Sequence, residues 1–334
     1  MPQAPDRTND SPSAGTELLS DVLGRVRLAS AVFLAGEFSE PWAFRSTDEE
    51  TLCAIVQPGA QHLVLFHVAV EGRFTITLDS GVTATVNAGD AVVLPYCDVH
   101  TMGWPKDTPA VAIASLVPPP PWAAMPVVRH GGGGAPTRIL CGYLHCAELL
   151  FNPLLRALPP LIHVRPVSEQ AAEWRQGSLR YALSQAQGQA RPVPALVDRL
   201  PELVLVDCLR QYAEELPAGQ AGWLGALRDP LLCRALTLLH AQPAHPWTVD
   251  TLANQVAASR SVLADRFTQV LGVSPIRYLT QWRMELAAQM LRTESHLGIA
   301  AIADRVGYES EAAFSRAFKR HVGCAPASWS RQGN

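Results

Sequence analysis

An internal repeat in the C-terminal third of the chain restricts its fold more than any other feature of the sequence. One copy covers residues 248–272 and the other covers residues 298–323. In the first segment of each copy, apolar residues recur at positions i, i+3, i+4 and i+7, the spacing of one helix face. A tight turn and a second periodic segment follow in both copies. The repeat therefore predicts two helix-turn-helix units in one chain.

Residues at the ends of these segments support the two units. Thr248 and Ser259 precede the two helices of the first unit, and Ser310 precedes the second helix of the second unit. A side-chain oxygen at such a position can cap a helix N-terminus. Gly272 and Gly323 follow the last helix of each unit, as is common at helix C-termini. The buried face expected for the second helix of the first unit consists of Val262, Leu263, Phe267 and Val270.

A longer helix is expected between the two units. Ser274 and Pro275 mark its start, because Ser is a good cap and Pro is favoured at the first helical position. A helix of about 18 residues spans about 27 Å at about 1.5 Å per residue. Successive major grooves on one face of DNA are about 34 Å apart. Two recognition helices held at the ends of this helix can therefore enter adjacent grooves.

The charge distribution distinguishes the repeat region from the rest of the chain. The whole chain has a net charge of −3. Residues 226–334 contain 12 basic and 8 acidic residues, a net charge of +4, whereas residues 1–225 contain 15 and 22, a net charge of −7. We therefore expect only the C-terminal region to bind a polyanion.

The repeat region resembles the DNA-binding domain of the AraC/XylS family of bacterial transcription regulators. The resemblance covers about residues 229–331. It includes R-Y-L-T-Q-W-R-M-E-L-A at residues 277–287 and I-A-D-R-V-G-Y-E-S-E-A-A-F-S-R-A-F-K-R at residues 302–320. It implies a one-component transcriptional regulator that binds specific double-stranded DNA. RNA polymerase would be a further partner if the protein is an activator.

The recognition faces are expected at the outward positions of the second helix in each unit. In the first unit these positions are Arg260, Ser261, Ala264 and Asp265, and in the second they are Glu311, Ala312, Ser315, Arg316, Lys319 and Arg320. Arg316 is expected to make a bidentate contact with guanine or to clamp a phosphate. Lys319 and Arg320 are expected to contact phosphates.

Two features of these faces leave alternatives open. Asp265 is unexpected, because the family often carries a basic or amide residue at this position. A carboxylate would repel phosphate or accept a hydrogen bond from cytosine. Arg260, Arg266 and Arg320 could instead lie on a solvated or ion-paired helix face.

Residues 18–167 have the pattern of a β-rich domain. Short apolar runs alternate with Gly-containing turns at a spacing of about ten residues, which favours an antiparallel barrel or sandwich. The runs expected to form strands are residues 62–70, 73–78, 82–86, 91–94, 110–117 and 138–144.

Part of this region resembles the cupin-type sensor domain found in a branch of AraC regulators. Residues 89–100, G-D-A-V-V-L-P-Y-C-D-V-H, have the G-x5-P-x4-H spacing of the second cupin motif, with Cys97 where cupins often carry Gly. The first motif retains His67 but lacks the H-x-H pair of metal cupins. A barrel of this kind offers a concave pocket for a small-molecule effector. The expected ligand-binding residues are His67, His100 and Cys141.

The same three residues allow other interpretations. Imidazole and thiolate groups bind zinc, so His67, His100 and Cys141 could hold this metal, or they could be core residues with satisfied hydrogen bonds. Cys97, Cys141 and Cys146 lie in one domain and leave open a metal- or thiol-responsive regulator. An enzyme is not expected, because the metal-binding H-x-H pair is missing and no acid–base pair stands out.

The sequence thus predicts an α+β multidomain protein: an N-terminal cupin-like antiparallel β-barrel, a helical dimerisation segment and a C-terminal all-α domain with two helix-turn-helix units. The expected boundaries are a disordered N-terminus at 1–17, the sensor domain at 18–167, the helical segment at 168–216, a linker at 217–228 and the DNA-binding domain at 229–331. A stripe of Leu196, Leu200, Leu203 and Leu209 suggests a homodimer, unless it packs on the barrel.

The cysteine count and the N-terminus indicate a cytoplasmic protein. Seven cysteines in a chain of 334 residues do not form a disulfide framework, which favours a reducing compartment. The N-terminus has no signal-peptide pattern. The charge-free run at 108–128 contains six prolines and therefore cannot cross a membrane as a helix.

Overall fold

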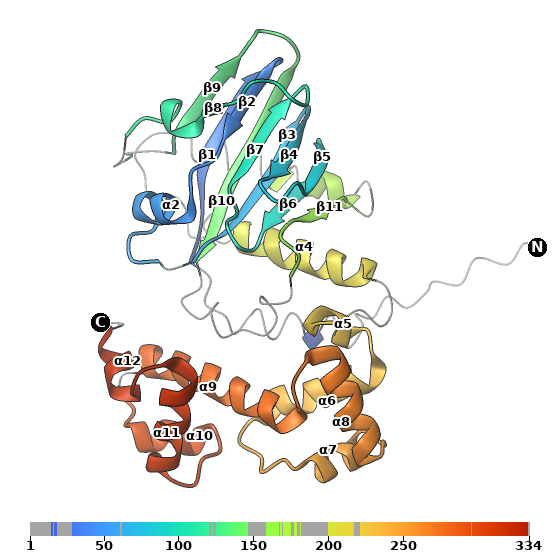
Figure 1. Cartoon of the computed structure of the whole chain (residues 1–334), viewed down its shortest axis with the longest axis vertical. Coiled ribbons are helices and arrows are strands. Elements are labelled where there is room, and N and C mark those ends of the chain that lie inside the picture. The colour runs from blue at the N-terminus through green and yellow to red at the C-terminus, as the bar shows by residue number, and fades with distance from the viewer. Residues whose placement is uncertain are drawn as a thin grey trace, which may run out of the picture. The chain divides into compact units, whose positions relative to one another are not determined.

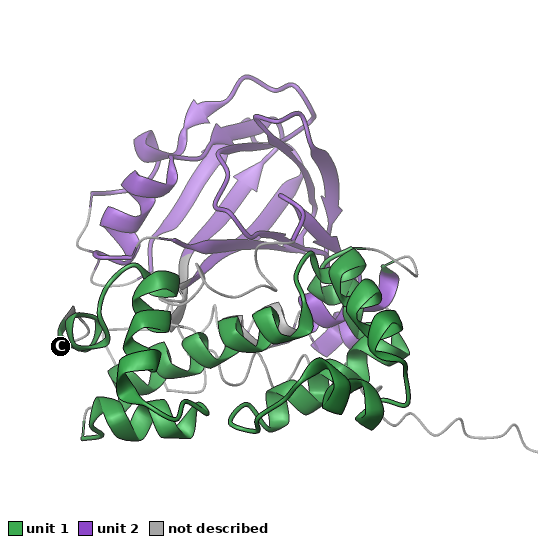
Figure 2. Ribbon diagram, turned by 60° about the horizontal axis from the view of Figure 1, so that its bottom comes forward, with its two compact units in different colours: residues 1–25, 151–153, 216–334 green, residues 26–150, 154–215 purple. Residues whose placement is uncertain are grey.

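The computed structural model divides into two units (Figure 2). Unit 1 comprises residues 1–25, 151–153 and 216–334, and unit 2 comprises residues 26–150 and 154–215. The structure describes residues 15, 17–18, 29–60, 62–119, 122, 125–145, 158–166, 168, 170–174, 177–178, 181, 200–216, 221–294 and 296–332. The expected disordered segment 1–17 and most of the expected helical segment 168–216 therefore lie outside the described residues.

Unit 2 contains two sheets (Figure 1). The six-stranded sheet has the order β11 (Ile162–Val164), β6 (Ala91–Leu94), β3 (Val64–Glu71), β10 (Pro136–His145), β1 (Ala29–Ser39) and β9 (Val127–Gly131). The five-stranded sheet has the order β5 (Thr83–Asn87), β4 (Arg73–Leu78), β7 (His100–Trp104), β2 (Trp42–Arg45) and β8 (Val111–Ala112). The sheets share a core that includes Phe38, Trp42, Phe74, Ile76 and Met102.

The predicted fold class is confirmed, with differences in detail. The pairs β1–β9 and β2–β8 run parallel, whereas the expectation was an antiparallel barrel. The helix α2 (Glu49–Val56) interrupts a region that the sequence pattern assigned to strands. The side chain of Asp48 accepts a hydrogen bond from the Thr51 amide, so this helix has an ordinary N-terminal cap.

The apolar run at 110–117 is also not the expected strand. Only β8 is extended, and a 3-10 turn, η1 (Ile113–Ser115), follows it. Ile113 and Val117 are apolar because they pack against the barrel core from this turn. Apolar runs this short cannot distinguish a strand from a buried helical turn.

Cys97 shows why cupins often carry Gly at this position. Its φ angle is +53°, in the left-handed region that Gly adopts without steric cost. The Cys97 amide donates a hydrogen bond to the Leu94 carbonyl, which closes the turn after β6. The side chain is 2% exposed. Cys97 is therefore a buried turn residue.

The helix α4 (Leu200–Glu215) belongs to unit 2 and packs against β1, β6, β10 and β11. Leu209 on α4 is fully buried. Leu209 was expected either to face a second copy or to pack on the barrel of its own chain. Its burial and the packing of α4 on these strands favour the second alternative for this residue. Leu196 and the side chains of Leu200 and Leu203 lie outside the described residues.

Unit 1 is built from helices α5 (Trp223–Leu227), α6 (Pro230–Ala241), α7 (Val249–Gln255), α8 (Arg260–Leu271), α9 (Pro275–Thr293), α10 (Ile299–Arg305), α11 (Glu311–Val322) and α12 (Pro326–Gln332). The long helix α9 connects the group α5–α8 to the group α10–α12 (Figure 1). Thr248, Ser259 and Ser310 cap α7, α8 and α11 as predicted. Ser274 precedes α9 but makes no side-chain cap hydrogen bond.

Part of the expected linker 217–228 is folded into unit 1. Residues 223–227 form α5, and the Trp223 side chain is 2% exposed. The indole Nε1 of Trp223 donates to the Tyr278 hydroxyl at 2.7 Å, and this hydroxyl lies 2.8 Å from His240 Nε2. The Gly, Ala and Pro content of the segment suggested a linker, but the apolar residues of α5 are buried against α6 and α8. Residues 217–220 lie outside the described residues.

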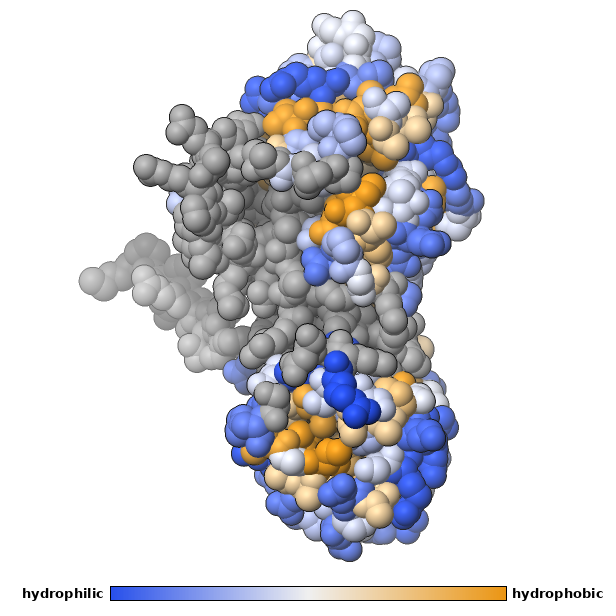
Figure 3. All heavy atoms as spheres, turned by 90° about the vertical axis from the view of Figure 1, so that its left-hand side faces the viewer, coloured by the Kyte–Doolittle hydropathy of each residue, from blue (hydrophilic) through white to orange (hydrophobic). Residues whose placement is uncertain are grey.

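The surface of the described residues is mixed in character. On the face in Figure 3, hydrophobic residues form patches among hydrophilic ones in both units. Among the helices of the described residues, none is long and apolar enough to span a membrane.

Candidate functional site

The two helix-turn-helix units present α8 and α11 as recognition helices. Leu263, Phe267 and Val270 bury one face of α8, and Phe314 and Phe318 bury the corresponding face of α11. The Phe267 ring meets the Tyr278 ring of α9 edge-on, with centroids 5.7 Å apart. The same helix faces are buried in both units, so their opposite faces remain at the surface.

On α8, the arginines at and beside the expected contact positions form ion pairs with carboxylates. Arg260, Ser261 and Asp265 are exposed, and Ala264 is half-buried. Arg260 forms an ion pair with Asp250 of α7 at 3.1 Å. Arg266 pairs at 2.6 Å with Asp229, whose carboxylate caps α6. Arg266 is therefore a structural residue, and Arg260 is partly neutralised.

The basic residues among the expected contact residues of α11 differ from those of α8, because they form no ion pairs with the described residues. Glu311, Ala312, Arg316, Lys319 and Arg320 are exposed, and Ser315 is half-buried. Within the described parts of the chain, Arg316, Lys319 and Arg320 have no ion-pair partner at 4 Å or less. This helix can therefore offer three cationic groups to a polyanion.

Val262 does not lie on the buried face of α8, where it was predicted. Its side chain is 54% exposed, whereas Leu263 is fully buried. The residue four positions after Val262 is Arg266, whereas Phe267 follows Leu263 at that spacing, so the apolar period itself favours Leu263 as the buried residue. Val262 lies beside Ser261 on the outward surface, where an apolar side chain can contact a thymine methyl group.

Arg283 of α9 links the loop before the first helix-turn-helix unit to the turn of the second unit. Its guanidinium donates to the Pro243 and His245 carbonyls, before α7, at 2.7 and 2.9 Å. It also donates to the Gly307 carbonyl, in the turn between α10 and α11, at 3.2 Å. Burial lowers the pKa of Arg283 from its usual value. One side chain thus fixes the loop before the first unit and the turn of the second unit to the helix between them.

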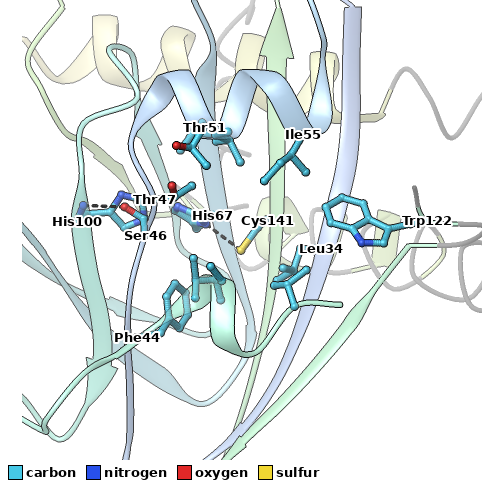
Figure 4. Close-up of a pocket in the computed structure, with 15 residues that line it drawn as sticks. Leu34, Phe44, Ser46, Thr47, Thr51, Ile55, His67, His100, Trp122 and Cys141 are labelled. Carbon is cyan, nitrogen blue, oxygen red and sulfur yellow. Dashed lines mark hydrogen bonds between the residues drawn. The ribbon is translucent and has the colours of Figure 1, made fainter. Parts of the chain in front are cut away.

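A cavity of about 100 Å³ lies in unit 2 (Figure 4). Strands of both sheets line it, together with α2 and the segment around η1. Most lining side chains are apolar, among them Leu34, Phe44, Ile55, Leu65 and Trp122. His67, His100 and Cys141 also line it, so the structure brings the three predicted ligand-binding residues together. Ser46, Thr47, Thr51 and Trp122 were missed, because α2 and the segment before β9 reach the cavity from distant parts of the sequence.

His67 and Cys141 are cross-strand neighbours in the six-stranded sheet. They are opposite each other in the β3–β10 register, and His67 Nδ1 lies 2.9 Å from Cys141 Sγ. Burial raises the pKa of the Cys141 thiol to about 12. Burial, and then the nearby His100, lower the pKa of His67 well below its usual value. At neutral pH this pair is therefore a thiol and a neutral imidazole.

His100 comes from β7 of the other sheet. Its Nδ1 lies 2.9 Å from the Asp98 carbonyl oxygen, and its backbone N–H donates to Ser46 Oγ at 2.9 Å. Burial lowers the pKa of His100 to about 4, although the hydrogen bond to Asp98 opposes the shift. The ring centroids of His67 and His100 are 5.0 Å apart. The Nε2 atoms of both rings are buried without a hydrogen-bond partner among the described residues.

The geometry does not support the zinc alternative. Among the described residues there is no group of three His, Cys, Asp or Glu side chains that could hold a metal ion. His67 Nδ1 and the Cys141 thiol are hydrogen-bonded to each other. The thiol would have to lose its proton before it could bind zinc. Cys146 lies outside the described residues.

Comparison with known proteins agrees with both parts of the structure. Residues 17–214 match a family model described as "Cupin", and residues 252–332 match one described as "Helix-turn-helix domain". The HTH-type transcriptional regulator AlkR of Acinetobacter baylyi is 30% identical over 95% of this chain and 99% of its own length. A putative AraC-like transcription regulator of Streptomyces antibioticus is 42% identical over 60% of this chain and 66% of its own.

Several solved structures match 31% of this chain. An AraC-type DNA-binding domain-containing regulator from Chromobacterium violaceum is 30% identical, with a TM-score of 0.30 over 31% of this chain and 93% of that chain. The two family models and the relative aligned over nearly the whole chain decide the assignment. The chain therefore belongs to the AraC family of DNA-binding transcriptional regulators, with a cupin domain in front of two helix-turn-helix units.

Proposed function

We propose that a small, largely apolar effector binds in the unit 2 cavity and controls how this regulator acts on its DNA. The cavity carries this proposal, because it combines an apolar lining with two buried histidines that have unused nitrogen atoms. Such a pattern is typical of small-molecule sites. In this proposal residues 18–216 sense the effector and residues 229–331 bind the DNA.

The composition of the cavity favours a neutral ligand. Among its described lining residues there is no Lys, Arg, Asp or Glu. An anionic effector would need a cationic partner to offset the cost of leaving water. Both histidines are neutral at pH 7 because burial disfavours their charged forms. Neither can therefore supply the positive charge.

The thiol-responsive alternative has less support than the effector proposal. A thiol reacts with oxidants as the thiolate, and this form requires a low pKa. Burial raises the pKa values of Cys53, Cys97 and Cys141 instead. The relatives in the comparisons are transcriptional regulators, so we propose that the barrel senses a ligand rather than catalysing a reaction.

Control of DNA binding requires unequal affinities. An effector changes the regulator only if it binds one arrangement of the protein more tightly than another. Coupling of this kind typically amounts to about 1–3 kcal/mol, or about 5- to 150-fold in DNA affinity. If the regulator activates transcription, RNA polymerase is the further partner.

A ligand screen by thermal shift on the full chain tests the proposal. A true effector should raise the melting temperature of the wild type and less so that of His67→Ala and His100→Ala. His296→Ala changes an exposed histidine of unit 1 and serves as the control. DNA binding is then measured with and without each hit. Equal stabilisation of all four proteins, or no effect of any hit on DNA binding, would contradict the proposal.

A further inference from the structure

We infer that the effector carries a hydroxyl group on an apolar body, and that His67 and His100 bind this hydroxyl from the two facing sheets. The inference rests on the proposed function, since it concerns the ligand of the same cavity. It follows from the hydrogen-bonding roles that the surroundings impose on the two imidazole rings.

His100 presents a hydrogen-bond acceptor to the cavity. Its Nδ1 contacts the Asp98 carbonyl oxygen, which can only accept, so Nδ1 must carry the ring proton. The ring is neutral at pH 7, because burial holds its pKa at about 4. A neutral imidazole has only one N–H, so Nε2 of His100 has a lone pair. This atom is buried without a partner among the described residues and requires a donor.

His67 presents a hydrogen-bond donor. The Cys141 thiol keeps its proton, and its closest hydrogen-bonding neighbour is His67 Nδ1 at 2.9 Å. An imidazole nitrogen is a good acceptor, whereas a thioether or thiol sulfur is a weak one. The thiol therefore donates to Nδ1, and the ring proton of neutral His67 lies on Nε2. This N–H is likewise buried without a partner among the described residues and requires an acceptor.

One hydroxyl group satisfies both requirements. It donates its proton to His100 Nε2, and its oxygen accepts from the His67 Nε2–H. The ring centroids are 5.0 Å apart, so a single oxygen atom can lie within hydrogen-bonding reach of both rings. A carboxylate cannot donate to His100, an ammonium cannot accept from His67, and a hydrocarbon can do neither.

The rest of the cavity defines the body of the ligand. Leu34, Phe44, Ile55 and Leu65 surround the histidines with apolar surface. The cavity volume is about 100 Å³. An apolar protein cavity of about 150 Å³ accepts benzene, so the ligand class for this smaller cavity is an alcohol or phenol with at most one six-membered ring.

Calorimetric titration of the full chain with two matched pairs tests the inference. Phenol and toluene differ by a hydroxyl in place of a methyl group, as do cyclohexanol and methylcyclohexane. We expect each hydroxyl compound to bind about tenfold or more tightly than its partner, because the hydrocarbon leaves both nitrogens unpaired. In His100→Leu this preference should decrease severalfold, because only the hydrogen bond to His67 remains. In the control His296→Leu it should remain.

Nitrogen-15 NMR of histidine-labelled full chain gives a second measurement that needs no variant. The expected tautomers are Nδ1–H for His100 and Nε2–H for His67, and phenol should shift the Nε2 resonances of both. The opposite tautomer of either ring would overturn the inference.

The outcomes separate the inference from the proposed function. If both members of each pair bind equally, the cavity is an effector site but the hydroxyl assignment is wrong. If the preference for phenol is undiminished in His100→Leu, the assignment is also wrong. If no member of either pair binds, the hydroxyl assignment fails, and the thermal-shift screen with DNA binding then decides the proposed function separately.

Discussion

At the scale of single residues, charge pairing divides the expected DNA contacts into two groups. Arg260 and Arg266 of α8 form ion pairs with Asp250 and Asp229. Arg316, Lys319 and Arg320 of α11 have none among the described residues. A cation without an ion-pair partner can bind a phosphate or a base without giving up the free energy of an existing ion pair. We therefore expect α11 to contribute more to DNA affinity than α8.

Replacing Arg316 by Ala should weaken DNA binding by about 1–3 kcal/mol and relax specificity at one base pair. Binding to a library with one randomised position at a time measures both effects. Arg260→Ala is the comparison and should have a smaller effect, since Arg260 already has a carboxylate partner. Uniform weakening over all sequences would show that Arg316 contacts a phosphate and not a base.

The buried histidines should make the stability of unit 2 depend on pH. The pKa of His100 is about 4 in the folded chain and about 6.5 in an unfolded one. Between these values the unfolded chain binds more protons, so stability is full above about pH 6.5 and decreases as pH falls towards 4. The loss from His100 at pH 5 is on the order of 2 kcal/mol.

Thermal unfolding of the full chain from pH 7 to pH 4.5 measures this dependence. His100→Phe should have a flatter profile, whereas His296→Gln should follow the wild type. A wild-type profile without a decrease below pH 6 would contradict the neutral state assigned to the two histidines.

At the scale of secondary-structure elements, the sequence predicted the helices of unit 1 better than the strands of unit 2. Helices α7, α8, α10 and α11 depend on local signals, namely caps and an apolar period, and these signals are visible in the sequence. Strands β2 and β7 pair with each other across some 60 residues, and no local pattern identifies such partners. Helix α2 did carry a local signal, Asp48 followed by Glu49 and Glu50, which the strand pattern around it obscured.

The sequence predicted three residues of the candidate site but not their hydrogen-bonding roles. His67 and His100 were found from the cupin motif spacing, and Cys141 from its residue type. Their hydrogen-bonding roles could not be predicted, because they depend on the Asp98 carbonyl and on the register that places Cys141 opposite His67. Trp122 could not be found either, since only the tertiary fold brings it to the cavity.

Arg283 should act as a positioning residue for the two recognition helices. Arg283→Gln removes hydrogen bonds to the Pro243 and His245 carbonyls, before the first helix-turn-helix unit, and to the Gly307 carbonyl, in the turn of the second. We expect weaker binding to the complete site by about 1–3 kcal/mol and less discrimination against sites with one base pair added between the half-sites. Competition binding with the two DNA spacings measures both.

The control for this prediction is Arg277→Gln, which removes an exposed charge from the same helix. Arg277→Gln should retain the discrimination between spacings. If Arg283→Gln also retains it, Arg283 contributes to stability alone.

At the scale of the whole molecule, the proposed homodimer needs a surface other than Leu209. Leu209 is fully buried within unit 2 and cannot face a second copy. In the same expected dimerisation segment, Trp174 and Tyr181 are 47% and 46% exposed. They are seven residues apart in the sequence. Exposed aromatic residues are typical of protein interfaces, so we expect the dimer contact there.

Sedimentation of the full chain at tens of micromolar should show a dimer. Trp174→Ala should weaken the dimer by about 2 kcal/mol or more without lowering the melting temperature. Leu209→Ala should lower the melting temperature without weakening the dimer, because truncation of a buried leucine costs about 2–5 kcal/mol of stability. A wild-type chain that remains monomeric at this concentration excludes the dimer.

The two helix-turn-helix units are joined in a fixed order by α9, and their outward residues differ: Asp265 lies on α8, whereas Arg316 lies on α11. The two halves of a DNA site for one chain therefore differ in sequence, and the site has a direction. If the site is inverted, the protein can bind it only by turning end for end. A promoter could thus use the polarity of this site, as well as its sequence, to orient the regulator towards or away from the start of transcription.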